Sequence, residues 1–309
     1  MLSLGLSVAV LALASLVHAA PAPLAARQAI TTLSTSQIST FKPYSFYASA
    51  GYCKSAATLA WNCGANCDAN PGFHPVASGG DGDAVQFWYV GVDSTLGTVI
   101  VAHQGTDPSQ ILSDVTDADF FLESLDSTLF PGVSSSVQAH SGFANEQAKT
   151  ATQVLAAVKT ALSKFSVTKV TIVGHSLGGA IGLLDSVYLP LHLSGVTFKA
   201  ILYGLPRVGN QAFADLASVG NIVTHINNME DFIPILPGRL LGFHHPTGEI
   251  HIQDSGAWDA CPGQDNTSDL CTTGDVPTIF EGNSNNHNGT VSDLTIFCEV
   301  LNLTPSRPV

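Results

Sequence analysis

The stretch VTIVGHSLGGAIGLL, residues 170–184, holds the pattern that decides the fold. The β-branched run at residues 168–173 predicts a short, buried parallel strand, and the small residues from Gly178 onward predict a helix that packs closely against it. Between them, Gly174-His175-Ser176-Leu177-Gly178 fits G-x-S-x-G, in which a serine on a sharp strand-to-helix turn acts as a nucleophile. Alone, these residues could be a serine between two glycines, so the flanking strand and helix favour the nucleophile.

The rest of the chain alternates between strand and helix patterns. Alternating or β-branched runs predict a hairpin at residues 86–92 and 98–103, and further strands at 168–173, 198–203, 221–226 and 249–253. Helical periodicity predicts helices at residues 44–59, 142–164, 178–193, 211–219 and 292–301, and turn-forming residues predict a loop at 65–83. The alternation predicts an α/β fold with a mostly parallel central sheet flanked by helices, in one domain over residues 28–309.

The composition allows a large core and argues against one class of partner. The 309 residues are 45% hydrophobic and 11% charged, so the chain can bury a sizeable interior. The formal net charge is −13, whereas binding to nucleic acid requires a basic face. We therefore expect no nucleic-acid partner.

The N-terminal residues have the pattern of a targeting segment. An apolar run at residues 4–17 is too short to span a bilayer and ends in the small-residue pattern of a cleavage site. Residues 1–19 are therefore predicted to be a signal peptide, with residues 20–27 a candidate pro-segment, and the protein is expected to be secreted without a transmembrane segment. Secretion exposes N-x-S/T sequences to glycosylation, and the chain has three of them, at Asn266, Asn288 and Asn302.

Six cysteines in an oxidising compartment predict three disulfides. Proximity along the chain favours two of them, and the remaining cysteines form the third: Cys63–Cys67, Cys261–Cys271 and Cys53–Cys298. A zinc site at Cys63 and Cys67 is the weaker interpretation, because the chain offers no second ligand pair at a suitable spacing.

A serine nucleophile needs a histidine base that is oriented by an acid, and on this kind of sheet the chain order is serine, acid, histidine. Asp231 follows the strand at residues 221–226, with Glu230 as a neighbouring rival and Asp254 as a weaker one. His287 lies in a loop before the last predicted helix, where catalytic residues are often found. The residues alone do not separate it from a solvated loop histidine. The other candidates are His244 and His245, close behind Asp231, and His251 inside a predicted strand.

Attack by a serine nucleophile on a carbonyl carbon also calls for two N–H donors that bind the oxyanion. Leu177, directly after the nucleophile, is expected to supply one of them. Thr106 lies in the turn after the strand at residues 98–103 and is expected to supply the other, although this segment could be an ordinary glycine turn.

Five segments together resemble the fungal secreted lipases of the class 3 family, which also includes feruloyl esterases. In chain order they are HQGTDP, AHSGF, GHSLGGA, NNMEDFIPILP and NNHNG, and the resemblance spans residues 44–298. It implies an α/β-hydrolase fold, the catalytic residues Ser176, Asp231 and His287, and the oxyanion donors Thr106 and Leu177. It also implies the long-range disulfide Cys53–Cys298.

The resemblance further implies a short lid helix over the active site. The lid would consist of Pro108, Ser109, Gln110, Ile111, Leu112, Ser113, Asp114 and Val115, with an apolar face formed by Ile111, Leu112 and Val115. The alternative is a buried helical turn that does not move. Two features depart from the family: His103-Gln104 stands where many relatives have an aromatic or aliphatic residue and an arginine, and the Asn288 sequon directly follows the expected base.

The predicted function is a secreted serine ester hydrolase, foremost a triacylglycerol lipase that acts at a lipid–water interface through an acyl-enzyme on Ser176. A feruloyl esterase or another carboxylesterase for soluble substrates is the alternative, and a non-catalytic binding protein is a remote one. The expected partners are the lipid or other ester substrate and, transiently, the lipid surface. No cofactor or metal is required, and a monomer is expected.

Overall fold

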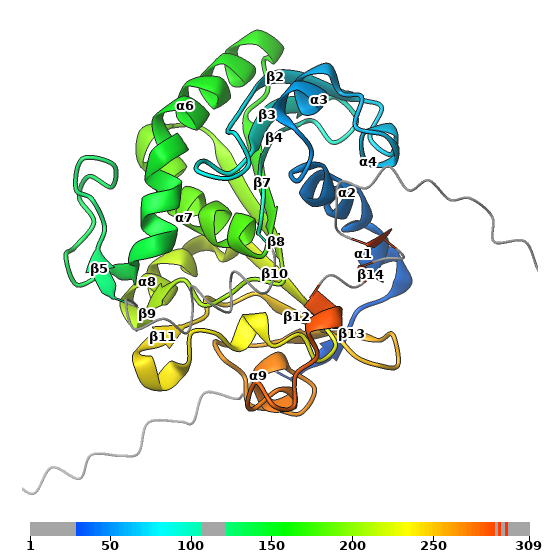
Figure 1. The fold of residues 1–309 in the computed structure, drawn as a ribbon, viewed down its shortest axis with the longest axis vertical. Coiled ribbons are helices and arrows are strands. Elements are labelled where there is room, and N and C mark those ends of the chain that lie inside the picture. Colours follow the sequence, from blue (N-terminus) through cyan, green and yellow to red (C-terminus); the bar gives the residue numbers. More distant parts are fainter. Residues whose placement is uncertain (1–28, 107–120, 288–289, 292–293, 296–309) are drawn as a thin grey trace, which may run out of the picture.

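The structure, a computed structural model, describes residues 29–106, 121–287, 290–291 and 294–295 (Figure 1). The predicted signal peptide at residues 1–19, the candidate pro-segment at 20–27 and the predicted lid at 108–115 lie outside the described residues. Among the described residues, no helix combines the length and the apolarity that crossing a bilayer requires.

A nine-stranded sheet forms the centre of the molecule, in the order β1-β13-β12-β10-β8-β7-β4-β3-β2. Its strands are β1 (Thr31–Thr32), β2 (Phe73–Gly79), β3 (Trp88–Asp93), β4 (Thr98–His103), β7 (Lys169–His175), β8 (Thr197–Tyr203), β10 (Val223–Asn228), β12 (Glu249–Ile252) and β13 (Trp258–Cys261). The five middle strands, from β4 to β12, are parallel, and antiparallel strands flank them on both sides. The predicted mostly parallel sheet is thus confirmed.

Helices cover both faces of this sheet (Figure 1). One face carries α2 (Lys42–Ala50) and α3 (Ser55–Ala60), and the other carries α6 (Ser141–Phe165), α7 (Leu177–His192) and α8 (Gln211–Ala217). Along β4, Val99 and Val101 pack into the core on the α6–α7 side, whereas Ile100 and Ala102 pack into the core on the α2 side. Because both faces are buried, the middle of this strand, residues 99–102, is apolar.

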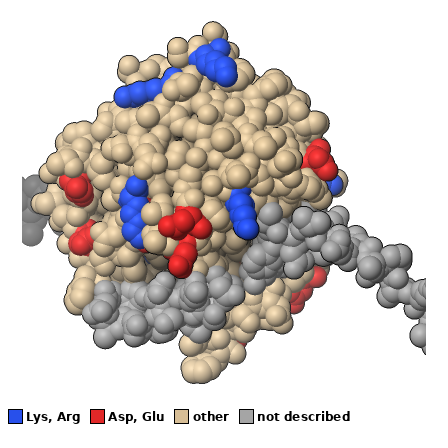
Figure 2. Space-filling view, turned by 45° about the horizontal axis from the view of Figure 1, so that its top comes forward, with Lys and Arg blue, Asp and Glu red and all other residues tan. Residues whose placement is uncertain are grey.

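Shorter elements complete the described part of the chain. A second sheet has the order β11-β9-β6-β5, with β5 (Leu122–Ser124), β6 (Gln138–His140), β9 (Gly209–Asn210) and β11 (Phe243–His244). The short helices are α1 (Thr35–Ser39), α4 (Ala65–Asp68), η1 (Val219–Asn221), η2 (Ile233–Ile235), η3 (Arg239–Leu241), α9 (Thr272–Asp275) and α10 (Ser284–His287). On the face shown in Figure 2, lysine and arginine side chains are scattered and form no basic patch.

Two predictions for the N-terminal third of the chain are wrong. The helix expected at residues 44–59 breaks between α2 and α3 at Gly51, which packs so closely on β4 that a Cβ there would lie 2.9 Å from the carbonyl oxygen of His103. The loop expected at residues 65–83 contains α4 and the edge strand β2. Pro75 lies at an irregularity of β2, and an edge strand is where a proline is tolerated.

The helix predicted at residues 292–301 is also wrong where the structure describes it. There, β15 (Leu294–Thr295) pairs with β14 (Thr290–Val291) as a small antiparallel sheet. Three of these four residues are β-branched, which favours an extended backbone. The other predicted strands and helices are present, with ends that differ by no more than two residues.

The structure contains the predicted disulfides Cys63–Cys67 and Cys261–Cys271, so the zinc interpretation of the first pair is wrong. Cys298 lies outside the described residues, and Cys53–Cys298 stays a prediction. The Asn266 side chain bonds to the Pro262 carbonyl and the Ser268 N–H inside the loop that Cys261–Cys271 closes. Its glycosylation stays a prediction, and Asn288 and Asn302 lie outside the described residues.

Candidate active site

Ser176 lies on a strained turn between β7 and α7. Its backbone has φ 60° and ψ −128°, a region that residues with a side chain rarely adopt. The Ser176 N–H holds this conformation by donating to the carbonyl oxygen of Tyr203 at 2.9 Å. The side chain is therefore presented at the carboxyl end of β7, as the G-x-S-x-G pattern predicts.

The two glycines of the motif are required by close backbone contacts. A Cβ on Gly174 would lie 2.2 Å from the carbonyl oxygen of Gly178, and a Cβ on Gly178 would lie 2.3 Å from that of His103. Both distances are far below van der Waals contact, so only glycine fits at either position. The turn is thereby packed against the end of β4.

The structure brings Ser176, His287 and Asp231 together. His287 Nε2 lies 2.7 Å from Ser176 Oγ, and His287 Nδ1 lies 2.8 Å from Asp231 Oδ2. The second carboxylate oxygen of Asp231 accepts the Ile233 N–H at 2.9 Å, and all three catalytic candidates are buried. In this arrangement the imidazole can take the serine proton while the carboxylate orients the ring.

Glu230, the rival acid, instead holds the loop that carries His287. Its backbone carbonyl accepts the Asn283 N–H at 2.7 Å, and its carboxylate accepts the side-chain amide of Asn286 at 2.5 Å. The amide of Asn228 donates to the Asn286 carbonyl at 2.9 Å. The segment after β10 and the segment that ends in His287 are thus joined by three hydrogen bonds next to the Asp231–His287 pair.

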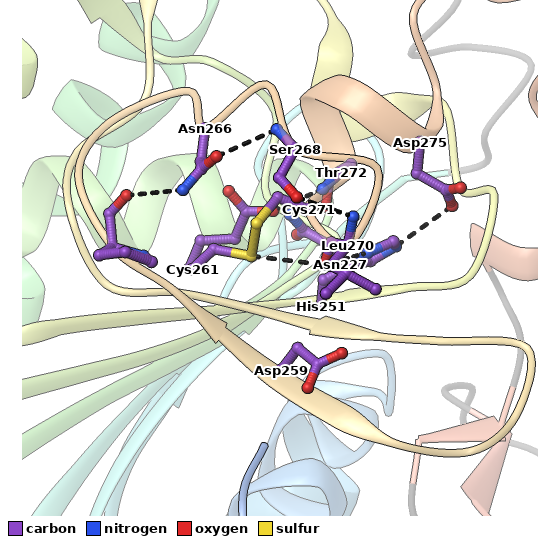
Figure 3. Close-up of a disulfide and its surroundings, with 12 residues drawn as sticks. Asn227, His251, Asp259, Cys261, Asn266, Ser268, Leu270, Cys271, Thr272 and Asp275 are labelled. Carbon is purple, nitrogen blue, oxygen red and sulfur yellow. Dashed lines mark hydrogen bonds and ion pairs between the residues drawn. A yellow bond between two sulfur atoms is a disulfide. The ribbon is translucent and has the colours of Figure 1, made fainter. Parts of the chain in front are cut away.

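The other candidate histidines are engaged elsewhere. His251 is buried beside the Cys261–Cys271 disulfide, with Nε2 2.9 Å from the Met229 carbonyl and 3.7 Å from Asp275 (Figure 3). His244 and His245 contact Asp265 and the Pro234 carbonyl, respectively. Asp254 is exposed after β12.

The two expected oxyanion donors belong to adjacent segments. Leu177 is the first residue of α7 and follows Ser176 directly, at the positive end of the helix dipole. Thr106 follows Gly105, where a Cβ would lie 2.5 Å from the carbonyl oxygen of His175. The turn that carries Thr106 therefore packs against the residue that precedes Ser176.

A buried polar network explains the unusual His103-Gln104 pair beneath this turn. His103 Nε2 lies 2.8 Å from Asp185 Oδ2, and the Gln147 amide donates to the other Asp185 oxygen at 2.9 Å. Gln104 exchanges two hydrogen bonds, both 2.8 Å, with the backbone of Phe87. Sequence reasoning missed Asp185, although it is the one carboxylate in a helix, α7, that consists mostly of apolar residues.

One group of potential metal ligands comes together in the part of the chain that the structure describes. Ligand atoms of Glu249, Cys261 and Cys271 lie within 4.8 Å of one another. Both sulfur atoms belong to the disulfide, and Glu249 accepts the Thr272 N–H at 2.7 Å. With its thiols oxidised, this group does not offer the thiolates that zinc requires.

We expect the protein to lose stability in acid because of its buried histidines. Burial and the neighbouring charges of His225 and Arg207 lower the pKa of His245 to about 3, and burial lowers the pKa of His140 to about 4. An unfolded histidine titrates near about 6.5, so between these values the unfolded chain binds protons that the folded chain does not. Each such group should lower the unfolding free energy by about 1.4 kcal/mol per pH unit as the pH falls through this window.

Urea unfolding at pH 7, 6, 5 and 4 measures this slope. His245→Gln keeps an N–H donor for the Pro234 carbonyl but has no titrating ring, so its stability should fall less steeply with acid than that of the wild type. Parallel slopes for the two proteins would contradict the assignment.

The sequence of the chain is similar to those of known lipases. Residues 100–241 match the model of a family described as lipase (class 3). A secreted mono- and diacylglycerol lipase of Malassezia globosa is 33% identical over 214 residues, which cover 68% of each chain. Another from the same organism is 34% identical over 197 residues, or 62% of this chain and 64% of that relative, so the chain spans under two thirds of its length.

Solved structures share the fold. The triacylglyceride lipase of Rhizomucor miehei aligns with a TM-score of 0.74 at 26% identity, over 88% of this chain and 100% of that one. Lipase II of Rhizopus niveus aligns with a TM-score of 0.75 at 24% identity, over 88% of this chain and 100% of that one, a likeness of fold alone. With the sheet order and its helices, these likenesses confirm the predicted α/β-hydrolase fold.

Proposed function

Because the chain belongs to the class 3 lipase family, we propose that it is a serine ester hydrolase, a lipase that cleaves acylglycerols through an acyl-enzyme on Ser176. The observation that carries the proposal is the line of hydrogen bonds from Ser176 through His287 to Asp231, at 2.7 and 2.8 Å. A protein that merely kept the fold for binding would not need these three buried side chains in this order.

The proposed reaction has two halves. Ser176 Oγ attacks the ester carbonyl carbon as His287 Nε2 takes the hydroxyl proton, and the Leu177 and Thr106 N–H groups bind the oxyanion. When the tetrahedral intermediate collapses, His287 gives its proton to the departing alcohol, and the acyl group stays on Ser176. Water then attacks the acyl-enzyme in the same way, releasing the fatty acid. Asp231 orients the imidazole and stabilises its cationic form throughout.

Exposed apolar side chains on the chain segments that follow Asp231 and precede His287 support a lipid substrate. Leu240, Leu241, Ile279 and Phe280, here called the apolar rim, are 104%, 61%, 40% and 91% exposed. They lie on two segments, one following Asp231 and the other leading to His287, and both segments line one cavity of about 600 Å³. Exposed apolar surface at such a place is typical of contact with a lipid surface.

Replacing Leu240 and Phe280 together by serine should weaken adsorption to emulsified oil by about tenfold or more, since burying one such apolar side chain contributes about 1.5–3 kcal/mol and about 1.4 kcal/mol corresponds to a factor of ten. Hydrolysis of dissolved p-nitrophenyl butyrate should stay unchanged, because neither side chain belongs to the proposed catalytic group. Leu59→Ser with Val219→Ser is the matched control, since these residues are 50% and 67% exposed away from the two segments. An equal loss in both double variants would exclude a specific role of the apolar rim.

Which class of ester the protein hydrolyses is decided by comparing the rates with different substrates. Triacylglycerol is the first candidate, and partial glycerides are the second, because the relatives from Malassezia globosa are named mono- and diacylglycerol lipases. The experiment compares emulsified triolein, diolein and monoolein with methyl ferulate, and we expect hydrolysis of oleoyl esters. Cleavage of the ferulate ester alone would instead favour the feruloyl esterase alternative.

The proposal extends to the rest of the chain. The relatives named above are described as secreted, which supports an extracellular enzyme with residues 1–19 as a signal peptide. We take residues 28–309 as one catalytic domain, with residues 108–115 as its lid. Mass spectrometry of the secreted protein tests the cleavage site, and a mature N-terminus before residue 20 would contradict this assignment.

A further inference from the structure

His175, the second residue of the G-x-S-x-G motif, has no step in the proposed reaction. It lies at the end of β7 and is buried. Its ring centroid is nevertheless only 4.5 Å from that of His287. A buried, titratable side chain thus lies next to the proposed base without taking part in the proposed reaction.

Both ring nitrogens of His175 make short hydrogen bonds. Nε2 lies 2.8 Å from the backbone carbonyl oxygen of His287, and Nδ1 lies 2.7 Å from the hydroxyl oxygen of Tyr52. A carbonyl only accepts, so Nε2 carries a proton. Burial, together with the charge of His287, holds the pKa of His175 well below its usual range. The ring is therefore neutral, and Nδ1 accepts a hydrogen bond from the Tyr52 hydroxyl.

The Tyr52 hydroxyl also lies against the turn that carries Thr106. A Cβ on Gly105 would lie 2.1 Å from this oxygen and 2.5 Å from the His175 carbonyl oxygen. Gly105 is therefore enclosed by Tyr52 and His175, and its successor is the expected oxyanion donor. One tyrosine thus contacts both the oxyanion turn and, through His175, the backbone of the base.

We propose that Tyr52 and His175 form a positioning pair, which fixes the His287 backbone and the Thr106 turn relative to Ser176. The inference rests on the proposed function and adds to it two residues that act through others. The bonds from Glu230 and Asn228 attach the His287 segment to β10. The bond from His175 attaches the same segment to β7, the strand that carries the nucleophile. Small displacements of a catalytic group are costly to the rate.

Tyr52→Phe is the first test, measured with dissolved p-nitrophenyl butyrate. We expect kcat to fall about tenfold with little change in KM, because one hydrogen bond of about 1.4 kcal/mol no longer holds the reacting geometry. Tyr47→Phe is the matched control, since Tyr47 is a buried tyrosine of the neighbouring helix whose hydroxyl donates to Asp93 Oδ2 at 2.5 Å. It should lower the thermal midpoint and leave kcat unchanged.

His175→Gln and His175→Leu supply a rescue test. Glutamine offers an N–H for the His287 carbonyl and an oxygen for the Tyr52 hydroxyl, whereas leucine offers neither. We expect kcat to fall by about 100-fold in the leucine variant and by only a few-fold in the glutamine variant.

Three results would overturn the inference. They are equal losses in the two His175 variants, equal effects of Tyr52→Phe and Tyr47→Phe on kcat, and a fall in kcat/KM that comes from KM alone. A wild-type protein without esterase activity would overturn the proposed function itself. Wild-type activity that Tyr52→Phe leaves unchanged would overturn the positioning pair alone.

Discussion

Ser176→Ala is expected to lose ester hydrolysis by about 10⁶-fold, because no other atom can form the acyl-enzyme. The fold should survive the change. Alanine adopts the φ of 60° at this turn with the same strain as serine, and the side chain contributes one hydrogen bond, to His287. The measurement is the rate of p-nitrophenyl butyrate hydrolysis, together with the thermal midpoint.

Ser186→Ala is the matched control for this variant. Ser186 is a buried serine on α7 whose hydroxyl donates to the Leu183 carbonyl at 2.6 Å, and its loss should leave the rate unchanged. A phosphonate ester should label the wild type and Ser186→Ala but not Ser176→Ala. Labelling of another residue, or full activity in Ser176→Ala, would show that the nucleophile lies elsewhere.

Asp231→Asn is expected to lower kcat by about 10⁴-fold at nearly constant side-chain volume. The Asp231 carboxylate accepts from His287 Nδ1 at 2.8 Å and from the Ile233 N–H at 2.9 Å. An amide in its place can turn only one oxygen to these two donors. An amide N–H that faces Nδ1 stabilises the tautomer with its proton on Nε2, which cannot accept from Ser176. The change should therefore appear in kcat and in the rate of phosphonate labelling.

Glu230→Gln is the control next in the chain. Glutamine keeps an oxygen for the Asn286 amide, and the backbone bond from Asn283 does not depend on the side chain. A change of only a few-fold is expected, since the loop stays attached. If Glu230→Gln lost the activity and Asp231→Asn kept it, the acid would be misassigned.

The sequence predicted the parts of the fold that local patterns encode. The turn from β7 into α7 follows from β-branched residues and closely spaced glycines, and the parallel strands follow from their apolar runs. The strands β1 and β13 have no such signal, because they are short and owe their conformation to pairing with each other and with β12. The close packing of Gly51 against His103, where the predicted helix is interrupted, joins residues far apart along the chain, so spacing does not reveal it.

In the candidate site, too, some residues follow from local sequence patterns and others depend on contacts between distant parts of the chain. Ser176 could be placed from its position after a strand, but the choice of Asp231 over Glu230 and the choice of His287 needed the family resemblance. The location of His287 depends on long-range bonds from Asn283 and Asn286 to Glu230, which spacing does not encode. The His103–Asp185 pair was missed for a similar reason, since a buried carboxylate does not reveal a partner 82 residues away.

The bonds that join the Glu230 and Asn286 segments have a consequence for inactivation by heat. They tie the His287 segment to the end of β10, and the bond from His175 ties it to β7 of the same sheet. Local opening begins where few contacts hold a segment, so mild heating should release the His287 segment while the sheet keeps Ser176 and Asp231 in place. Activity would then be lost before the sheet melts, and cooling should restore it without refolding of the sheet.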